Sequence, residues 1–180
     1  EGKGLGGKET ESLAILSRAV KINAGIWAED LHITTGANTV DAKTLEASAI
    51  EGKGGRPAFA LDTAAIGGMY AGRITLVGTE KGLGVNNSGT WSAEDNLTLD
   101  WNGDLKNSGT IYSKGNTDLR ASRLENDKTI AAERNLSAAA KENIRNQGKL
   151  LAGENMGIYA GKTLDNAGHA MESGNNLSIE

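Results

Sequence analysis

From residue 84 onward, apolar and polar residues alternate in short runs that recur about every 20 residues. Most copies have an apolar residue, an Asn two positions later and a Gly two positions after that, then a polar turn and Asn-Leu-x-Leu or a close variant. Alternation with a period of two is the pattern of strands with one buried face. The copies begin in steps of 20, 19, 20 and 20 residues, at Val85, Leu105, Leu124, Ile144 and Leu164.

A unit of about 20 residues with two or three short strands cannot bury its own apolar face, but stacking on the next unit buries it. The pattern therefore predicts an all-β fold, a right-handed parallel β-helix (solenoid) with about 20 residues per coil. Strands of successive coils should pair in parallel. One segment, 136–144, has high helix propensity, yet its apolar residues occupy the apolar positions of the repeat, and we predict a strand there.

Two columns of asparagine follow from the repeat. The first points inward, where stacked amides can hydrogen-bond along the column, whereas an unpaired buried amide costs about 1–3 kcal/mol. We predict a structural ladder of these residues: Asn87, Asn107, Asn126, Asn146 and Asn166. The second column is expected in turns, where Asn tolerates positive φ and bonds its own backbone: Asn96, Asn116, Asn135, Asn155 and Asn176.

The first half of the chain is less regular. Asn23 and Gly25 have the spacing of Asn87 and Gly89, which indicates a coil near residues 20–35. The segment 50–60 contains two glycines and the single proline and is predicted to be an excursion, and 74–77 to be a strand. We place a change of pattern near residue 84, with an irregular β-helical part over 1–84 and regular coils over 85–180.

Composition narrows the picture further. With 3 Trp, 3 Tyr and 1 Phe among 180 residues, the core should be narrow and filled by Leu, Ile, Val and Ala, with Trp101 exposed beside a turn. The net charge of −4 does not favour nucleic acid, which needs a basic face. No apolar run reaches the 18 residues of a membrane-spanning helix. The start, EGKGLGGKET, lacks the regions of a signal peptide, and we expect a fragment of a longer protein.

Candidate chemistry is weak. Residues 2–7 match G-x-G-x-x-G, but a dinucleotide site also needs a preceding strand and a following helix. His32 and His169 lie about seven coils apart and are expected to be exposed strand residues. The aspartates occupy different phases of the repeat, so they form no column of the kind that polysaccharide-cleaving β-helices need: Asp62, Asp95, Asp100, Asp104, Asp118 and Asp127. We predict no enzyme, no catalytic or metal residues, no cofactor and no small-molecule substrate.

The outward positions are mostly short and polar, which is typical of a passive shaft and not of a sugar-binding face. One predicted column holds Thr98, Asp118, Ser137, Gly157 and Ser178, and another holds Thr90, Thr110, Thr129, Lys149 and His169. The Asn-x-Ser/Thr sequons at Asn86, Asn96, Asn135 and Asn176 mostly follow from the repeat itself, and we do not expect them to mark glycosylation.

Three segments carry a family resemblance. SRAVKINAGIWAEDLHITTGANTVDA (17–42) resembles the late part of the secretion domain of two-partner secretion exoproteins. PAFALDTAAIGGMYAGRITLVGTEKGLGVNNSG (57–89) resembles the stretch that joins this domain to the shaft, and 85–180 resembles filamentous haemagglutinin repeats. The family includes filamentous haemagglutinins, haemolysins and contact-dependent growth inhibition effectors. Its early Asn-Pro signatures are absent, since the single proline is Pro57.

The resemblance implies a parallel β-helix that crosses the periplasm and outer membrane through a dedicated two-partner secretion transporter and is secreted or displayed on the bacterial cell surface. It implies a non-catalytic scaffold and export region of a large exoprotein that mediates adhesion or delivers a toxin to neighbouring cells, with an unknown cell-surface receptor. The alternative is a direct adhesive binding module that itself contacts host-cell or bacterial receptors.

Overall fold

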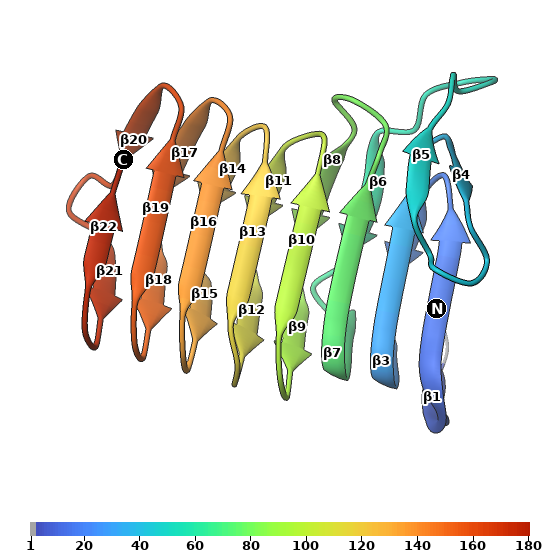
Figure 1. Ribbon diagram of the computed structural model, residues 1–180, viewed down its shortest axis with the longest axis horizontal. Coiled ribbons are helices and arrows are strands. Elements are labelled where there is room, and N and C mark those ends of the chain that lie inside the picture. Colours follow the sequence, from blue (N-terminus) through green and yellow to red (C-terminus); the bar gives the residue numbers. More distant parts are fainter. Residues whose placement is uncertain (1–2) are drawn as a thin grey trace.

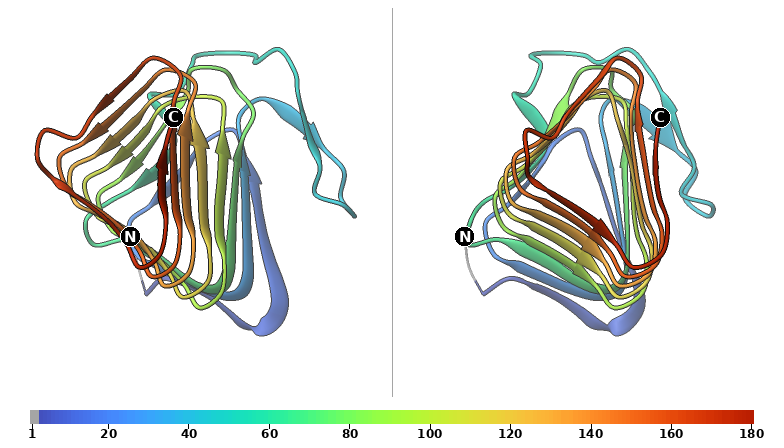
Figure 2. Two further views of the ribbon diagram at one scale, coloured as in Figure 1. Left: turned by 60° about the vertical axis from the view of Figure 1, so that its left-hand side comes forward. Right: turned by 90° about the vertical axis from the view of Figure 1, so that its left-hand side faces the viewer.

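The computed structural model describes residues 3–180, and its strands wind into a solenoid (Figure 1). Viewed along the rod, the coils superpose as a triangle (Figure 2). Regular structure in these residues consists of β-strands without a helix. The predicted all-β class, the parallel β-helix and the coil of about 20 residues are confirmed, because Leu105 pairs in register with Val85 on one side and with Leu124 on the other.

Three walls of parallel strands form the sides of the triangle, and the first two belong to one 13-stranded sheet. The first wall contains β9 (Thr90–Ala93), β12 (Thr110–Ser113), β15 (Thr129–Ala132), β18 (Lys149–Ala152) and β21 (Ala170–Ser173). The second contains β10 (Leu97–Trp101), β13 (Thr117–Ala121), β16 (Leu136–Ala140), β19 (Met156–Ala160) and β22 (Leu177–Ile179).

The third wall is a separate sheet of seven strands. It contains β2 (Val20–Ile22), β6 (Phe59–Thr63), β8 (Gly84–Asn87), β11 (Leu105–Asn107), β14 (Leu124–Asn126), β17 (Asn143–Asn146) and β20 (Thr163–Asp165). Strand pairing continues through residue 84, since β8 pairs with both β6 and β11. The proposed change of pattern at residue 84 stays a prediction.

Long strands join the first two walls near the N-terminus. They are β1 (Leu5–Ser17), β3 (Gly25–Thr35) and β7 (Gly68–Gly78). The start of β7 pairs with β9 and its end with β10, so the corner that separates these walls in later coils is continuous strand in the earlier ones. The strand predicted over 74–77 is confirmed as part of β7.

Local propensity yields to stacking in β16. Leu136, Ala138 and Ala140 are buried and alternate with the less buried Ser137 and Ala139. β16 pairs in register with β13 and β19. Burial against two neighbouring coils outweighs the weak helix preference of an alanine-rich run, and the predicted strand is confirmed.

The coil predicted near residues 20–35 is confirmed by β2 and β3, but its register differs from the prediction. Ile22, and not Asn23, occupies the column that continues through Thr63 to Asn87. Ile22 is buried, and this position lets its apolar side chain face the core, where Asn23 would have no amide beneath it. The proposed equivalence of Asn23 with Asn87 is therefore wrong by one residue.

The excursion is longer than predicted. It begins with an antiparallel hairpin of β4 (Asn38–Val40) and β5 (Ala47–Ala49) and continues to Phe59, where β6 begins. Asp41 shapes the hairpin turn, since its Oδ1 accepts the backbone N–H of Lys43 at 2.8 Å and of Thr44 at 2.9 Å. The segment 38–58, here called the lateral segment, stands out from one side of the rod (Figure 2).

Across residues 3–180, no helix has the length and apolar character that would let it cross a membrane.

Candidate functional site

A column of buried asparagine amides runs inside the third wall. Asn87 Nδ2 donates to Asn107 Oδ1 at 2.8 Å, and the same bond recurs from Asn107 to Asn126 and from Asn126 to Asn146 at 2.8 Å. The last bond, from Asn146 to Asn166, measures 2.6 Å. Four of the amides therefore donate to the equivalent residue of the next coil, and Asn166 Nδ2 donates instead to the carbonyl of His169 at 2.6 Å.

Each amide also bonds the backbone. Asn107 Nδ2 donates to the carbonyl of Thr129 at 3.1 Å, and its Oδ1 accepts the N–H of Gly109 at 3.4 Å. Asn87, Asn107, Asn126 and Asn146 are fully buried, so these contacts replace the water that the amides lose. The ladder is a neutral hydrogen-bonding element, and its contribution to stability stays a prediction.

The second asparagine column lies in turns as predicted, but the rest of that prediction is wrong. None of the five has a positive φ, because the non-glycine residues with positive φ in the described chain are Leu45 and Ala167. Their amides bond between coils: Asn135 Nδ2 donates to Asn116 Oδ1 at 2.9 Å, and Asn155 Nδ2 to Asn135 Oδ1 at 2.8 Å. Equivalent turns of successive coils stack directly upon each other, which brings their asparagine side chains together.

Trp101 is buried, contrary to the prediction that it is exposed. It is 2% exposed, and its Nε1 donates to the carbonyl of Leu83 at 2.8 Å. The ring occupies the space over Gly78, its registered partner in β7, where a Cβ would lie 2.3 Å from the ring. Trp91 is also fully buried and donates to Thr63 Oγ1 at 3.0 Å. The core near β7 is thus wider than the predicted core of Leu, Ile, Val and Ala.

A charged clamp, which the sequence did not reveal, fixes the lateral segment to the rod. Arg18 donates through Nε and Nη2 to the two carboxylate oxygens of Glu80 at 3.0 and 2.9 Å. Its Nη1 donates to the carbonyl of Lys53 at 2.7 Å, and Glu80 Oε2 accepts the N–H of Ala37 at 3.0 Å. The clamp thereby joins Lys53, within the lateral segment, and Ala37, the residue before it, to two turns of the solenoid.

The Arg18 guanidinium holds the pKa of Glu80 below its ordinary range, chiefly through the hydrogen bonds to the carboxylate. A carboxyl whose pKa is lowered on folding stabilises the folded form above its unfolded pKa of about 4.3, and this contribution disappears as the pH falls further. We expect Glu80→Gln to loosen the lateral segment at neutral pH and tryptic cleavage after the exposed Lys43 and Lys53 to become several-fold faster.

The control is Glu51→Gln, at an exposed carboxylate of the same segment. It should leave the rate of cleavage near that of the unmodified chain. Between about pH 5 and pH 2, which spans the unfolded pKa and the lowered folded pKa of Glu80, the unmodified chain should become easier to cleave with an acid-stable protease, while the Glu80→Gln variant should change little. Equal cleavage of the two variants at pH 7 would show that the clamp does not hold the segment.

The histidines do not form a site. His32 is half-buried, not exposed as predicted, and its Nε2 lies 2.9 Å from Thr34 Oγ1. Burial lowers the pKa of His32. His169 is exposed in a turn before β21, and its predicted column is wrong by one residue, since Lys149 pairs with Ala170. Within residues 3–180, no group of three or more His, Asp or Glu could hold a metal ion.

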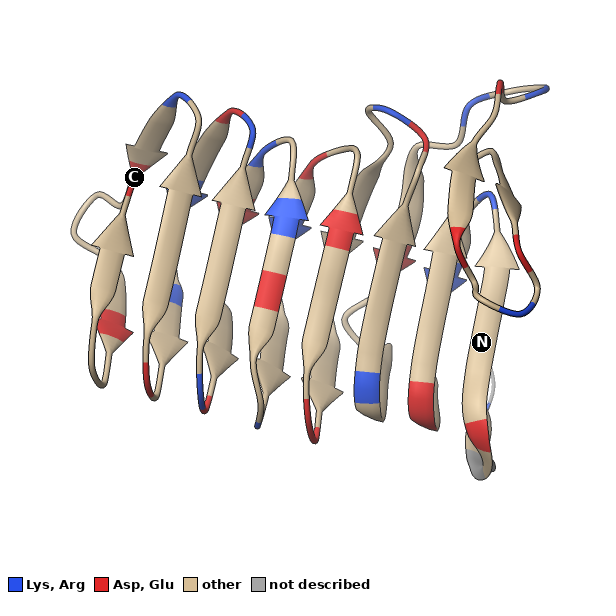
Figure 3. Ribbon diagram, viewed as in Figure 1, with Lys and Arg blue, Asp and Glu red and all other residues tan. Residues whose placement is uncertain are grey.

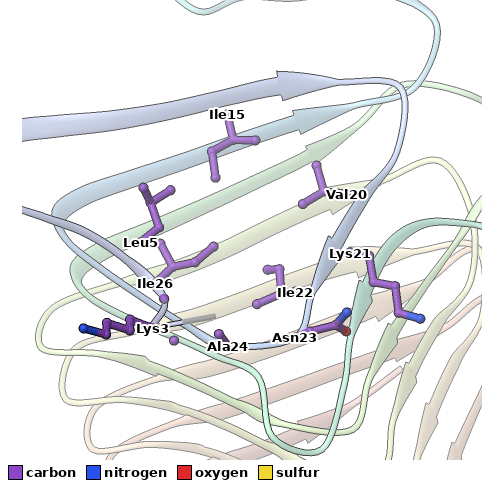
Figure 4. Close-up of a pocket in the computed structure, with 11 residues that line it drawn as sticks. Lys3, Leu5, Ile15, Val20, Lys21, Ile22, Asn23, Ala24 and Ile26 are labelled. Carbon is purple, nitrogen blue, oxygen red and sulfur yellow. The ribbon is translucent and has the colours of Figure 1, made fainter. Parts of the chain in front are cut away.

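The glycine motif near the N-terminus does not have the context of a dinucleotide site. Gly2 lies outside the described residues, and Leu5 to Ser17 form β1 where such a motif needs a helix. A cavity of about 310 Å³ lies nearby, at the N-terminal end of the solenoid (Figure 4). Ile15, Val20 and Ile22 point into it, so it is the end of the apolar core.

Two protein families match successive stretches of the chain. The TPS secretion domain matches residues 1–112, and the haemagglutinin repeat matches residues 112–179. No solved structure matches the chain.

Several curated proteins are similar to this chain. A toxin CdiA of Yersinia pestis is 40% identical over 140 residues, covering 65% of this chain and 4% of that protein. A tRNA nuclease CdiA of Escherichia coli is 35% identical over 204 residues, covering 99% and 6%, respectively. A 16S rRNA endonuclease CdiA of Enterobacter cloacae is 33% identical over 180 residues, covering 99% and 5%. The chain thus spans only a small part of the relatives' length.

Proposed function

Because this chain belongs to the two-partner secretion exoprotein family, we propose that it is the non-catalytic scaffold and export region of a surface exoprotein that delivers a toxin to neighbouring cells. The chain is a secretion-domain and haemagglutinin-repeat region of a secreted, surface-displayed exoprotein. The toxin and nuclease names of the relatives favour delivery over adhesion alone. The matched region makes up only 4–6% of those three proteins, so their named activities are assigned here to other parts of the exoprotein.

The observation that carries the proposal is the uninterrupted stacking of coils. Parallel pairing continues from β2 to β20 in the third wall and from β1 to β22 in the other two. Each coil contacts mainly its neighbours, so a chain of this kind can fold locally and in order. That property suits a rod that leaves the cell unfolded and folds outside.

The secretion-domain match implies an outer-membrane transporter of the two-partner system as a partner. We propose that the chain passes it unfolded and that coils form one by one on the outer side. Since the chain contains 0 Cys, no disulfide has to form or break on this route. The exoprotein would meet its receptor on the target cell through other parts, and this region would bind neither nucleic acid nor small molecules.

The outward side chains support a shaft more than a binding face. The registered column on the second wall holds Thr75, Thr98, Asp118, Ser137, Gly157 and Ser178. These short side chains offer no cluster of aromatic or arginine anchors, which dominate protein interfaces. A direct adhesive module remains the second candidate, and the same experiment separates the two.

The test uses the full-length exoprotein with its transporter. Thr98→Ala, Ser137→Ala and Ser178→Ala change the outward surface, and Leu119→Ala is the matched inward change at a fully buried position. We expect the outward variants to retain surface amount and inhibition of neighbouring cells, and Leu119→Ala to lower the exported amount. Outward variants that are exported normally but no longer attach to target cells would instead support the adhesive module.

A further inference from the structure

The inward face of the third wall does not distinguish one regular coil from the next. In the third wall, the inward residues of successive coils are an aliphatic residue and an asparagine, as in Leu105 with Asn107 and Leu124 with Asn126. A strand displaced by a whole coil would meet equivalent apolar and amide partners. In this wall, inward burial therefore selects the position within a coil but not which coil lies next.

The outward face of the same wall does distinguish neighbouring coils. After Lys21, Asp62 and the neutral Asn86, its central position carries charges whose sign alternates over four successive coils: Lys106, Glu125, Arg145 and Asp165. Lys106 Nζ lies 3.9 Å from Glu125 Oε2. A coil that stacked on its second neighbour would place Lys106 opposite Arg145.

The corners of the triangle carry further ion pairs between neighbouring coils. Figure 3 shows blue and red segments on the turns at both edges of the rod. At one corner, Asp104 pairs with Arg123 at 2.5 Å, and in the next two coils Glu142 pairs with Lys162 at 3.4 Å. At another, Lys114 bonds Glu94, and Glu133 follows in the next coil.

We propose that the alternating charges of Lys106, Glu125, Arg145 and Asp165 direct each of these coils to its neighbour in the chain, because a coil that skips one meets its own sign. Like charges directly opposite each other destabilise strand pairs, and opposite charges stabilise them. Exposed ion pairs contribute little to the stability of a correctly folded protein. Their role here is to separate correct stacking from stacking displaced by one coil, along this column and at the corner of Glu94, Lys114 and Glu133.

A crosslinking experiment on the full chain tests the proposal. The chain contains 0 Cys, so two engineered cysteines report one contact. Residues 108, 127 and 147 follow β11, β14 and β17 and stack in order, with Asp127 N donating to Asn107 O at 2.8 Å and Gln147 N to Asn126 O at 2.7 Å. Ser108→Cys with Asp127→Cys reports neighbouring coils, and Ser108→Cys with Gln147→Cys reports a skipped coil.

Two charge variants with unchanged net charge are refolded under reducing conditions and then oxidised. In the blocked variant, Glu125→Lys and Arg145→Glu place like charges at the neighbouring positions 106 and 125 and at 145 and 165, and opposite charges on second neighbours, while 125 and 145 stay opposite. In the inverted control, Lys106→Glu, Glu125→Lys, Arg145→Glu and Asp165→Lys keep the alternation. We expect the 108–147 crosslink to be about tenfold more abundant in the blocked variant, if each like-charge contact has its usual effect.

A 108–147 crosslink that is no more abundant in the blocked variant than in the inverted control would overturn the proposal. If the blocked variant does not refold, the proposal is tested on the chain with natural charges, by screening those charges with salt. Refolding in 1 M salt shortens the Debye length to about 3 Å, from about 10 Å at 0.1 M. The 108–147 crosslink should then increase in the chain with natural charges, and an unchanged yield would also overturn the proposal.

Discussion

Asn126→Leu is expected to destabilise the shaft by about 2–4 kcal/mol, because it interrupts a column of buried hydrogen bonds. The change removes the acceptor of Asn107 and the donor to Asn146, each bonded at 2.8 Å. It also removes the 3.1 Å bond to the carbonyl of Lys149. Leucine has the same number of side-chain heavy atoms and is larger, so the loss would come from unsatisfied polar groups and from overpacking and not from a cavity. Urea unfolding followed by circular dichroism measures the effect.

The matched control is Lys149→Ala, one coil further along the rod. The Lys149 side chain is exposed, and its backbone carbonyl, which accepts from Asn126, is unaffected by the substitution. Surface changes of this kind usually remain within about 0.5 kcal/mol. If the two variants unfolded at the same urea concentration, the ladder would contribute nothing measurable.

Trp101→Ala should destabilise the chain by about 3–5 kcal/mol, the usual cost of removing a fully buried tryptophan. The ring fills the space above Gly78. Because glycine has no side chain, that position cannot fill the cavity that the substitution leaves. The substitution also leaves the carbonyl of Leu83 without the indole donor. Thermal unfolding monitored by circular dichroism gives the comparison.

Trp27→Ala is the control for the loss of an indole. Trp27 is only half-buried and stacks on Tyr70 with ring centroids 5.9 Å apart. Exposed aromatic pairs contribute about 0.5–1.5 kcal/mol beyond their buried area, so this variant should unfold at a distinctly higher temperature than Trp101→Ala. If Trp101→Ala unfolded at the higher temperature, the surrounding chain would have filled the space over Gly78 without loss of stability.

The regular coils could be predicted because the alternation of apolar and polar residues that specifies each strand is local in the sequence and recurs in every coil. The period-two alternation around Leu136 and Ala138 was sufficient to choose strand over helix. Asn23 shows the limit of the same reasoning. The Asn-x-Gly spacing occurs there, but it is shifted by one residue from the register of the later coils. The burial of Ile22, and not the spacing, identifies the residue that faces the core.

Contacts between distant segments could not be predicted. Trp101 is buried because Gly78, in another coil, leaves room for its ring, and neither residue shows this alone. The Arg18–Glu80 clamp joins residues 62 positions apart in the least regular part of the chain. The second asparagine column was placed in turns, but its bonds between coils depend on the stacking of those turns.

Because coils stack at a constant spacing, the length of the rod is proportional to the number of residues in its repeats. Successive coils are about 4.8 Å apart and take about 20 residues each, so the rod lengthens by roughly a quarter of an ångström for every residue. Removing a whole coil, such as residues 124–143, would join equivalent positions and leave the internal contacts of the remaining coils intact. A lineage could thus tune how far its exoprotein extends into the space between cells by duplicating or deleting whole coils.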